Sequence, residues 1–166
     1  MTESPVVTAE RFRRVLGIYP TGVAVVTAID HHGEPAGLAV GSFTSVSLDP
    51  PLVAFLPDKK SSSFPRMRTA QSFCVNVLAS DQQELCRRFA VSGGDKFDGL
   101  AWSPTPTGAP LLPGVAAWID CCFGDIIEAG DHYIVLGRVH GLGGEPDAEP
   151  LVFSGGALGV FRGPAV

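Results

Sequence analysis

Residues 37–55 read GLAVGSFTSVSLDPPLVAF and contain two apolar segments separated by a polar stretch and a double proline. The first segment, Gly37–Phe43, and the second, Leu52–Leu56, have the length and composition of β-strands. Pro50 and Pro51 cannot donate a hydrogen bond to a sheet ladder, so they must lie at a corner or an edge. This stretch therefore predicts two strands with a sheet corner or edge at the prolines.

Short strands and turns continue on both sides of this stretch. Val23–Ala28 is apolar and β-branched, and the polar Asp30–Gly33 turn that follows predicts a hairpin back into residue 37. Further strands are expected at Phe73–Leu78, Ala116–Ile127, Tyr133–Leu142, near Leu151–Phe153 and near Gly159–Phe161. Six or more strands in tandem favour a mainly β fold, a small closed antiparallel barrel.

Two helices are expected beside the strands. Thr8–Tyr19 places Phe12, Val15 and Leu16 on one face, which is the pattern of an amphipathic helix. Ser80-Asp81-Gln82-Gln83 has the form of a capping box, and the helix that it opens should turn Leu85 and Phe89 inward. Flanking helices of this kind are compatible with a barrel.

Composition limits the functions open to the chain. Its 166 residues are 45% hydrophobic and 17% charged, which predicts a single domain over residues 1–166. The net charge of −5 leaves no broad positively charged surface, so we expect no binding of nucleic acid. Met1–Glu10 does not read as a secretory signal, and no apolar run of about 18 residues follows, so we expect a cytoplasmic protein without membrane contact.

Motifs of several enzyme classes are missing from the sequence. There is no GxGxxG, no P-loop lysine preceded by glycine, and no GxSxG. The four histidines lack metal-ligand spacing, and His31 and His32 fit a solvated turn. The four cysteines form no CxxC pair, and we expect them to be reduced thiols that pack as small apolar residues: Cys74, Cys86, Cys121 and Cys122. We therefore expect no metal and no classical catalytic acid, base or nucleophile.

Positive charge is concentrated in one segment. Lys59, Lys60, Arg66 and Arg68 fall within ten positions and are mixed with Ser61–Ser63. Lysine and arginine charges together with hydroxyl donors suit a phosphate group. A solvated basic loop is the alternative interpretation of this segment taken alone.

Several motifs together resemble those of the flavin reductase-like, FMN-binding split-barrel family, and in particular the reductase components of two-component flavin-dependent monooxygenases. The resemblance covers about residues 10–140 and keeps the family order of five landmarks: Thr21-Gly22-Val23, the SFxSxSLxPPLV pattern at Ser42–Val53, FCVNVL at Phe73–Leu78, Asp95-Lys96-Phe97, and Gly130-Asp131-His132.

This resemblance implies a split-barrel homodimer with flavin, FMN or FAD, in a groove near the subunit interface. It assigns the isoalloxazine ring to Val40, Gly41, Ser42 and Phe43, mostly through main-chain groups. The ribityl chain and phosphate are assigned to Pro57, Asp58, Lys59, Ser61 and Ser63, a second flavin-contacting stretch to Phe89, Ala90, Lys96 and Phe97, and the nicotinamide side to His132 and Tyr133. Gly41 stands where many relatives carry a polar residue, so only a main-chain contact is expected there.

The expected reaction is hydride transfer from NADH or NADPH to flavin, with delivery of reduced flavin to a separate oxygenase. Such chemistry needs orientation of two rings and no protein nucleophile or metal. Two alternatives remain open at this stage: a flavin- or haem-binding split-barrel protein without turnover, and a barrel that acts only as a dimeric interaction module. His132 is expected to be needed only for turnover, and a histidine that caps a turn is its plain structural interpretation.

Overall fold

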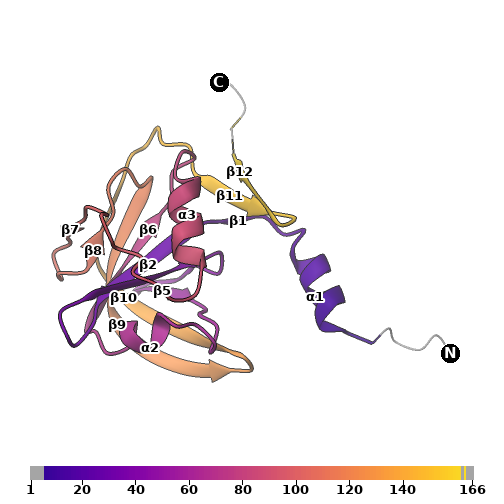
Figure 1. Ribbon diagram of the computed structural model, residues 1–166, viewed down its shortest axis with the longest axis horizontal. Coiled ribbons are helices and arrows are strands. Elements are labelled where there is room, and N and C mark those ends of the chain that lie inside the picture. Colours follow the sequence, from indigo (N-terminus) through magenta and orange to yellow (C-terminus); the bar gives the residue numbers. More distant parts are fainter. Residues whose placement is uncertain (1–5, 162, 164–166) are drawn as a thin grey trace.

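The computed structural model describes residues 6–161 and 163, and its main element is a seven-stranded antiparallel sheet (Figure 1). Met1–Pro5, part of the segment predicted to lack a secretory signal, lies outside the described residues. The strands of this sheet, in their spatial order, are β3 (Pro35–Val40), β2 (Ala24–Ile29), β6 (Ser72–Val77), β9 (Ala117–Ala129), β10 (His132–Gly144), β5 (Pro51–Phe55) and β4 (Thr44–Leu48). The predicted mainly β fold with few helices is confirmed.

Smaller elements surround this sheet. The helices are α1 (Ala9–Leu16), α2 (Phe64–Met67) and α3 (Gln83–Ala90). A three-stranded sheet joins β1 (Thr21–Gly22), β11 (Leu151–Ser154) and β12 (Ala157–Val160), and a short pair joins β7 (Ser103–Pro104) and β8 (Pro110–Leu111). In the described part of the chain, no helix has the length and apolarity needed to cross a membrane.

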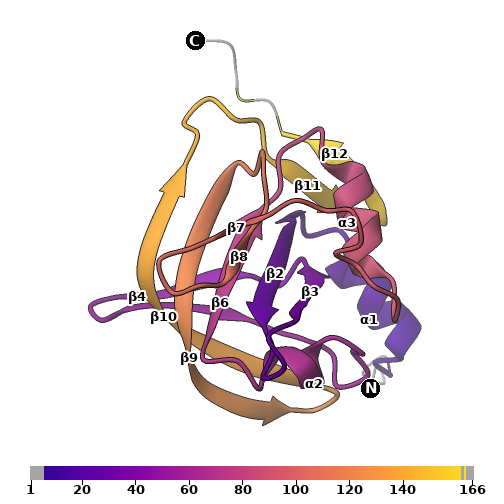
Figure 2. The ribbon, with the colours of Figure 1, turned by 60° about the vertical axis from the view of Figure 1, so that its left-hand side comes forward.

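The prediction of a closed barrel is wrong at the level of hydrogen bonding. The large sheet curls (Figure 2), and β9 and β10 carry two register shifts that favour bending, but the edge strands β3 and β4 are not paired with each other. Between them the chain leaves the ladder for three residues. There the Ser42 hydroxyl accepts a hydrogen bond from Leu56 N at 3.1 Å and donates to Leu56 O at 3.2 Å. This side-chain link ties the 41–43 linker to the end of β5 where a closed barrel would have ladder bonds.

Most predicted element boundaries are close to the observed ones. The expected strand at Gly37–Phe43 ends at Val40, and a separate edge strand, β4, follows the linker. Pro50 and Pro51 lie at the corner between β4 and β5, where Leu48 faces Pro51 in the ladder. The hairpin at Asp30–Gly33 is confirmed, with Gly33 N donating to Asp30 O at 2.9 Å. Of the two short C-terminal strands, β11 pairs with β1 and β12 pairs with β11, in the separate small sheet.

Helix ends differ more from expectation. Thr8 caps α1, because its hydroxyl accepts from Arg11 N at 3.2 Å, but the helix stops at Leu16 and not at Tyr19. The capping box at Ser80 is wrong. Gln82 occupies the N-cap position of α3 without a side-chain cap, and its amide oxygen instead accepts from Ala79 N at 3.0 Å.

Two apolar clusters hold the strands in place. One contains aromatic rings from β5, α2 and β6, with the Phe55 ring 6.2 Å from Phe64 and 5.3 Å from Phe73. The other contains Phe89 of α3 and Phe97, whose ring centroids are 5.2 Å apart in an edge contact. Because buried aromatic rings contribute large apolar areas, these clusters fix α2 and α3 against the sheet.

The turn between β2 and β3 is joined to the segment around α2 by a buried carboxylate. Arg66 of α2 donates from Nε to Asp30 Oδ2 at 2.9 Å, and the backbone N–H groups of His32 and Glu34 donate to Asp30 Oδ1. Burial alone would raise the pKa of Asp30, but these hydrogen bonds and the Arg66 charge outweigh it and hold the pKa at about 2. Arg66, which the sequence placed among the phosphate-binding charges, therefore has a structural role as the partner of Asp30.

This carboxylate makes the stability of the protein depend on acid pH. The pKa of Asp30 is below its ordinary value of 3.8, so its contribution is complete above that value and is lost as the pH falls toward about 2. We expect Asp30→Asn to flatten the fall in unfolding free energy between pH 4 and 2, measured by urea denaturation. An unchanged slope in the variant would contradict this role of the Asp30 carboxylate.

Candidate functional site

The segment after β5 and the tip of the β9–β10 hairpin lie side by side. Tyr133 N donates to Pro57 O at 3.0 Å, and Lys59 N donates to Asp131 O at 2.9 Å. Asp58 forms a single antiparallel bridge with His132. These bonds continue the register in which Phe55 of β5 faces Val135 of β10. Two groups of predicted site residues, far apart in the sequence, are thereby brought together.

Charged and aromatic side chains cluster at this junction. Lys59 Nζ lies 2.9 Å from Glu128 Oε2 and 5.3 Å from the centre of the Tyr133 ring. Arg68 approaches the same ring, with Cζ 5.5 Å from its centre. The hydrogen bond from Lys59 lowers the pKa of Glu128. Since exposed ion pairs are weak, Lys59 can exchange Glu128 for a stronger anion at little cost.

His132 is held by the acid that precedes it. Its Nδ1 lies 2.8 Å from Asp131 Oδ1, and this hydrogen bond lowers the pKa of Asp131. This hydrogen bond orients the imidazole through its Nδ1 edge, and the half-exposed ring lies at the junction with Asp58.

The serine hydroxyls brace the loop that contains the basic residues. Ser61 Oγ accepts from Ser63 N at 3.3 Å and Phe64 N at 3.2 Å, and Ser62 Oγ accepts from Gly93 N at 2.9 Å. Ser63 Oγ accepts from Lys96 Nζ at 3.1 Å. Each hydroxyl acts as an acceptor in these contacts and keeps its own proton for a further acceptor.

Lys96 joins three parts of the fold behind this loop. Its ammonium donates to Gly37 O at 3.3 Å, Ser63 Oγ at 3.1 Å and Phe89 O at 3.0 Å. A lysine ammonium has three protons, so these protein acceptors use all of them. Burial lowers the pKa of Lys96. The structure therefore gives Lys96 a bracing role, and its direct contact with flavin stays a prediction.

Phe89 and Phe97, the aromatic residues of the predicted second flavin-contacting stretch, belong to the core. Phe89 is 1% exposed and Phe97 is 8% exposed, while Ala90 lies exposed at the last position of α3. A Cβ at Gly37 would come within 2.7 Å of the Phe89 ring, so a glycine is needed where α3 meets β3. Their predicted flavin contacts remain untested, and their packing against the sheet is what the structure shows.

The 40–43 linker has features that fit a planar ligand. Val40 is buried at the end of β3, Gly41 is exposed, and Ser42 and Phe43 are half-buried. Among the described residues, no backbone hydrogen bond occupies the N–H groups of Gly41, Ser42 and Phe43. A Cβ at Gly41 would lie 2.8 Å from Thr21 Oγ1. Free backbone donors at and beside Gly41, which has no side chain, suit close approach by a ring with polar edges.

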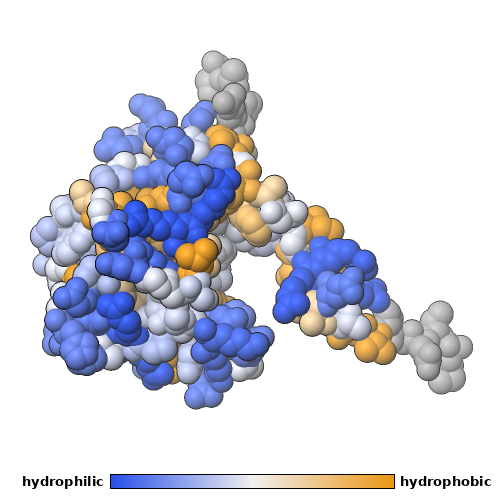
Figure 3. Space-filling view, in the orientation of Figure 1, coloured by the Kyte–Doolittle hydropathy of each residue, from blue (hydrophilic) through white to orange (hydrophobic). Residues whose placement is uncertain are grey.

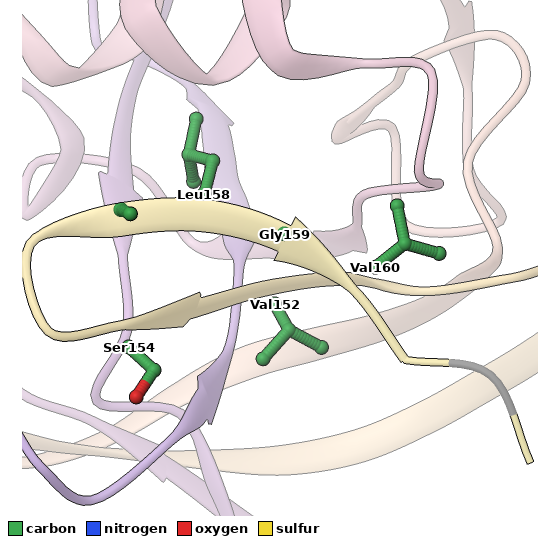
Figure 4. Close-up of a pocket in the computed structure, with 6 residues that line it drawn as sticks. Val152, Ser154, Leu158, Gly159 and Val160 are labelled. Carbon is green, nitrogen blue, oxygen red and sulfur yellow. The ribbon is translucent and has the colours of Figure 1, made fainter.

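Two pockets of the described surface are small. One of about 50 Å³ lies beside the linker and is lined by Gly22, Val23, Ala24, Phe43 and Val77. Another, of about 180 Å³, lies on the β11–β12 hairpin, from which all its labelled lining residues come (Figure 4). It contains none of the predicted site residues. Small-molecule sites usually enclose about 300–1,000 Å³, so neither pocket would enclose a flavin.

Sequence reasoning missed Glu128, which pairs with Lys59 at the junction. The sequence places Arg68 and Ser62 in the basic segment but does not predict the contact of Arg68 with the Tyr133 ring or that of Ser62 with Gly93 N. No local sequence signal marks these contacts, because the partners are separated by tens of residues. No group of three His, Cys, Asp or Glu side chains suited to a metal occurs in the described ranges, and the buried Cys74 and Cys121 have thiol pKa values raised by burial to about 12.

The bracing role of Lys96 leads to a stability prediction. Lys96→Met leaves three acceptors without their donor, so we expect the unfolding free energy to fall by about 1–3 kcal/mol. Urea denaturation at pH 7 measures it, with exposed Lys60→Met as the matched control. Equal stability of the two variants would contradict the bracing role.

Comparisons with known proteins show the family of the chain. The flavin reductase like domain family matches residues 16–161. The chain is 54% identical over 150 residues to a flavin reductase of Pseudomonas putida, covering 90% of this chain and 88% of that protein. It is 46% identical over 143 residues to the reductase subunit HsaB of a flavin-dependent monooxygenase of Rhodococcus jostii, covering 86% and 73%.

A solved structure shares the fold over nearly the full chain. The NADH:FAD oxidoreductase of Streptomyces globisporus, in complex with NAD and FAD fragments, superposes with a TM-score of 0.88 at 38% identity, covering 98% of this chain and 100% of that one. The resemblance drawn from the sequence motifs is confirmed, and the chain belongs to the flavin reductase-like domain family.

Proposed function

We propose that this chain is an NAD(P)H:flavin oxidoreductase, which reduces FMN or FAD by hydride transfer and supplies the reduced flavin to a separate monooxygenase component. The observation that carries the proposal is the junction of the 57–63 loop with the hairpin tip. It places Lys59 beside Tyr133, and Asp58 opposite His132. Membership of the family and the names of the two relatives support the same reaction.

The residues divide into an anion-binding part and a ring-binding part. Lys59 and Ser61, with Pro57, Asp58 and Ser63 as the frame of the loop, would hold the flavin ribityl chain and phosphate. The free N–H groups of Gly41, Ser42 and Phe43, next to Val40, would face the isoalloxazine ring and stabilise negative charge on it. The bound flavin supplies the hydride-accepting ring.

His132 and Tyr133 would form the nicotinamide side of the site. Asp131 orients the imidazole, and two cations, Lys59 and Arg68, lie close to the Tyr133 ring. Polar and aromatic groups fixed in this way orient a second ring against the first. Orientation of two bound reactants is the main contribution that a protein makes to hydride transfer.

The same proposal includes a homodimer in the cytoplasm. Helix α1 buries no side chain, and Phe12, Val15 and Leu16 on its apolar face are 56%, 52% and 52% exposed. Figure 3 shows this helix standing away from the body, with hydrophobic surface on it. On the edge strand β4, Leu48 is 95% exposed. A second copy would cover these surfaces, and sedimentation of a 17.4 kDa species would contradict the dimer.

Turnover separates this proposal from the alternative of a flavin- or haem-binding protein that stores its ligand. Purified protein is mixed with NADH or NADPH and with FMN or FAD, and absorbance at the nicotinamide band is followed. We expect consumption of nicotinamide well beyond one equivalent of protein. Binding of flavin without such consumption would support the storage protein instead.

The anion-binding part predicts a selective loss of flavin affinity. Lys59→Ala with Ser61→Ala removes a charge and a hydroxyl from the proposed phosphate contact. We expect the flavin Kd to rise about 10- to 100-fold, the effect of losing a charge-assisted hydrogen bond. Fluorescence titration with FMN measures it, and Arg87→Ala, which removes a charge from exposed α3, is the control.

The nicotinamide side predicts a different kinetic change. His132→Ala should raise the KM for the nicotinamide several-fold more than the KM for flavin, because it removes a group from only one of the two ring sites. His140→Ala, an exposed histidine further along β10, is the matched control. A larger effect on the flavin KM would move His132 to the flavin side.

A further inference from the structure

Two positively charged side chains share one aromatic ring and one carboxylate near the tip of the β9–β10 hairpin. Lys59 Nζ lies 5.3 Å and Arg68 Cζ lies 5.5 Å from the centre of the Tyr133 ring. Glu128 faces Tyr133 in the antiparallel ladder, so their side chains lie on the same face of the hairpin. The hydrogen bond and the charge of Lys59 lower the pKa of Glu128, and the charge of Arg68 adds to this effect. The cluster therefore combines two cations with a single anion.

Arg68 is fixed at its backbone but not at its guanidinium. Its N–H group donates to Phe64 O at 2.9 Å at the end of α2, and Phe64 is buried with its ring 5.4 Å from the Tyr133 ring. Within residues 6–161 and 163, the exposed guanidinium has the Tyr133 ring and the charge of Glu128 as neighbours, but no hydrogen bond or ion pair holds it. An arginine presents several N–H donors in a planar fork, which suits phosphate oxygens. Arg68 therefore places an uncommitted anion-binding group beside Lys59.

The carboxylate of Glu128 is the exchangeable member of this cluster. It accepts from Lys59 Nζ at 2.9 Å, yet its side chain is 75% exposed and that of Lys59 is 32% exposed. An exposed ion pair of this kind contributes little, because water replaces the contact readily. A phosphate monoester carries about two negative charges and three acceptor oxygens, and a carboxylate has one charge and two oxygens. A phosphate beside the Tyr133 ring can thus bind both cations, whereas Glu128 is bonded only to Lys59.

We propose that Glu128 is an internal competitor for the flavin phosphate: it pairs with Lys59 before flavin binds and is displaced when the phosphate binds Lys59 and Arg68 together. This inference rests on the proposed function, since it concerns the same flavin. It adds Glu128 and Arg68 to the residues that determine flavin affinity. A protein that supplies reduced flavin to a separate component must also release it, and a carboxylate that competes for the same cation keeps the flavin exchangeable.

Glu128→Gln removes the charge of the competitor and keeps its shape. We expect the Kd for FMN to fall about 2- to 5-fold, the range of an exposed ion pair. Fluorescence titration measures it. Asp125→Asn removes another exposed carboxylate, three residues earlier in β9, and as the matched control it should leave the Kd near that of wild type. Riboflavin has the same ring without phosphate, so its Kd should be equal in wild type and Glu128→Gln.

The two cations predict different partners for this effect. In a Lys59→Met background, the gain in FMN affinity from Glu128→Gln should be smaller, because Glu128 then has no ammonium to occupy; a general repulsion of phosphate by Glu128 would give the same gain in both backgrounds. Arg68→Met should raise the Kd for FMN about 3- to 10-fold and leave that for riboflavin unchanged, with Arg87→Met on exposed α3 as the control.

Several results would overturn the role of Glu128. Equal FMN affinities of Glu128→Gln and Asp125→Asn would exclude local competition. Weaker FMN binding by Glu128→Gln, or a urea midpoint well below that of wild type, would mean that the carboxylate positions Lys59 for the ligand or stabilises the fold. A change confined to the KM for NADH would assign the phosphate to the nicotinamide nucleotide. In each of these cases wild type still binds and reduces FMN, so the proposed function stands; if wild type binds no flavin, both fail.

Discussion

The antiparallel pairing of β5 with β10 determines where the functional groups of this protein lie. Phe55 faces Val135 in this ladder, and the chain leaves β5 in the same register. Pro57 must then pass Tyr133, and Lys59 must pass Asp131, as their backbone hydrogen bonds show. A shift of one residue would turn every side chain to the opposite face, so the buried positions of β5 fix the register. The 57–63 loop and His132 are therefore neighbours as a result of core packing.

A second constraint decides which charges remain available to a ligand. Arg66 and Lys96 lie close to the basic loop, yet Arg66 is paired with the buried Asp30, and Lys96 donates to Gly37, Ser63 and Phe89. The ammonium of Lys59 is paired with the exposed Glu128. Buried acceptors hold their donors strongly, while exposed ion pairs exchange easily. The basic residues in and around the loop thus include both structural charges, Arg66 and Lys96, and an available one, Lys59, and the difference depends on burial.

The open edges of the large sheet have a functional consequence. Since β3 and β4 do not pair, the chain between them crosses the gap with its backbone donors free, and a Ser42 side chain carries the connection to β5. Fully paired strands would have used those donors in the ladder. The same region contains the Gly41–Thr21 approach. An incomplete barrel is therefore what leaves hydrogen-bonding groups for a ring to use.

The sequence by itself determined the class of fold, the position of most strands, the corner at Pro50 and Pro51 and the family, because strand alternation, turn residues and ordered motifs are local signals. It also indicated the 57–63 loop and His132 as candidates for one site. Tertiary structure alone decided the helix ends, the unpaired edges β3 and β4, and the core positions of Phe89 and Phe97. It also decided that Arg66 and Lys96 make structural contacts. Each of these depends on partners distant in the chain, whose burial and distance are not written in any local pattern.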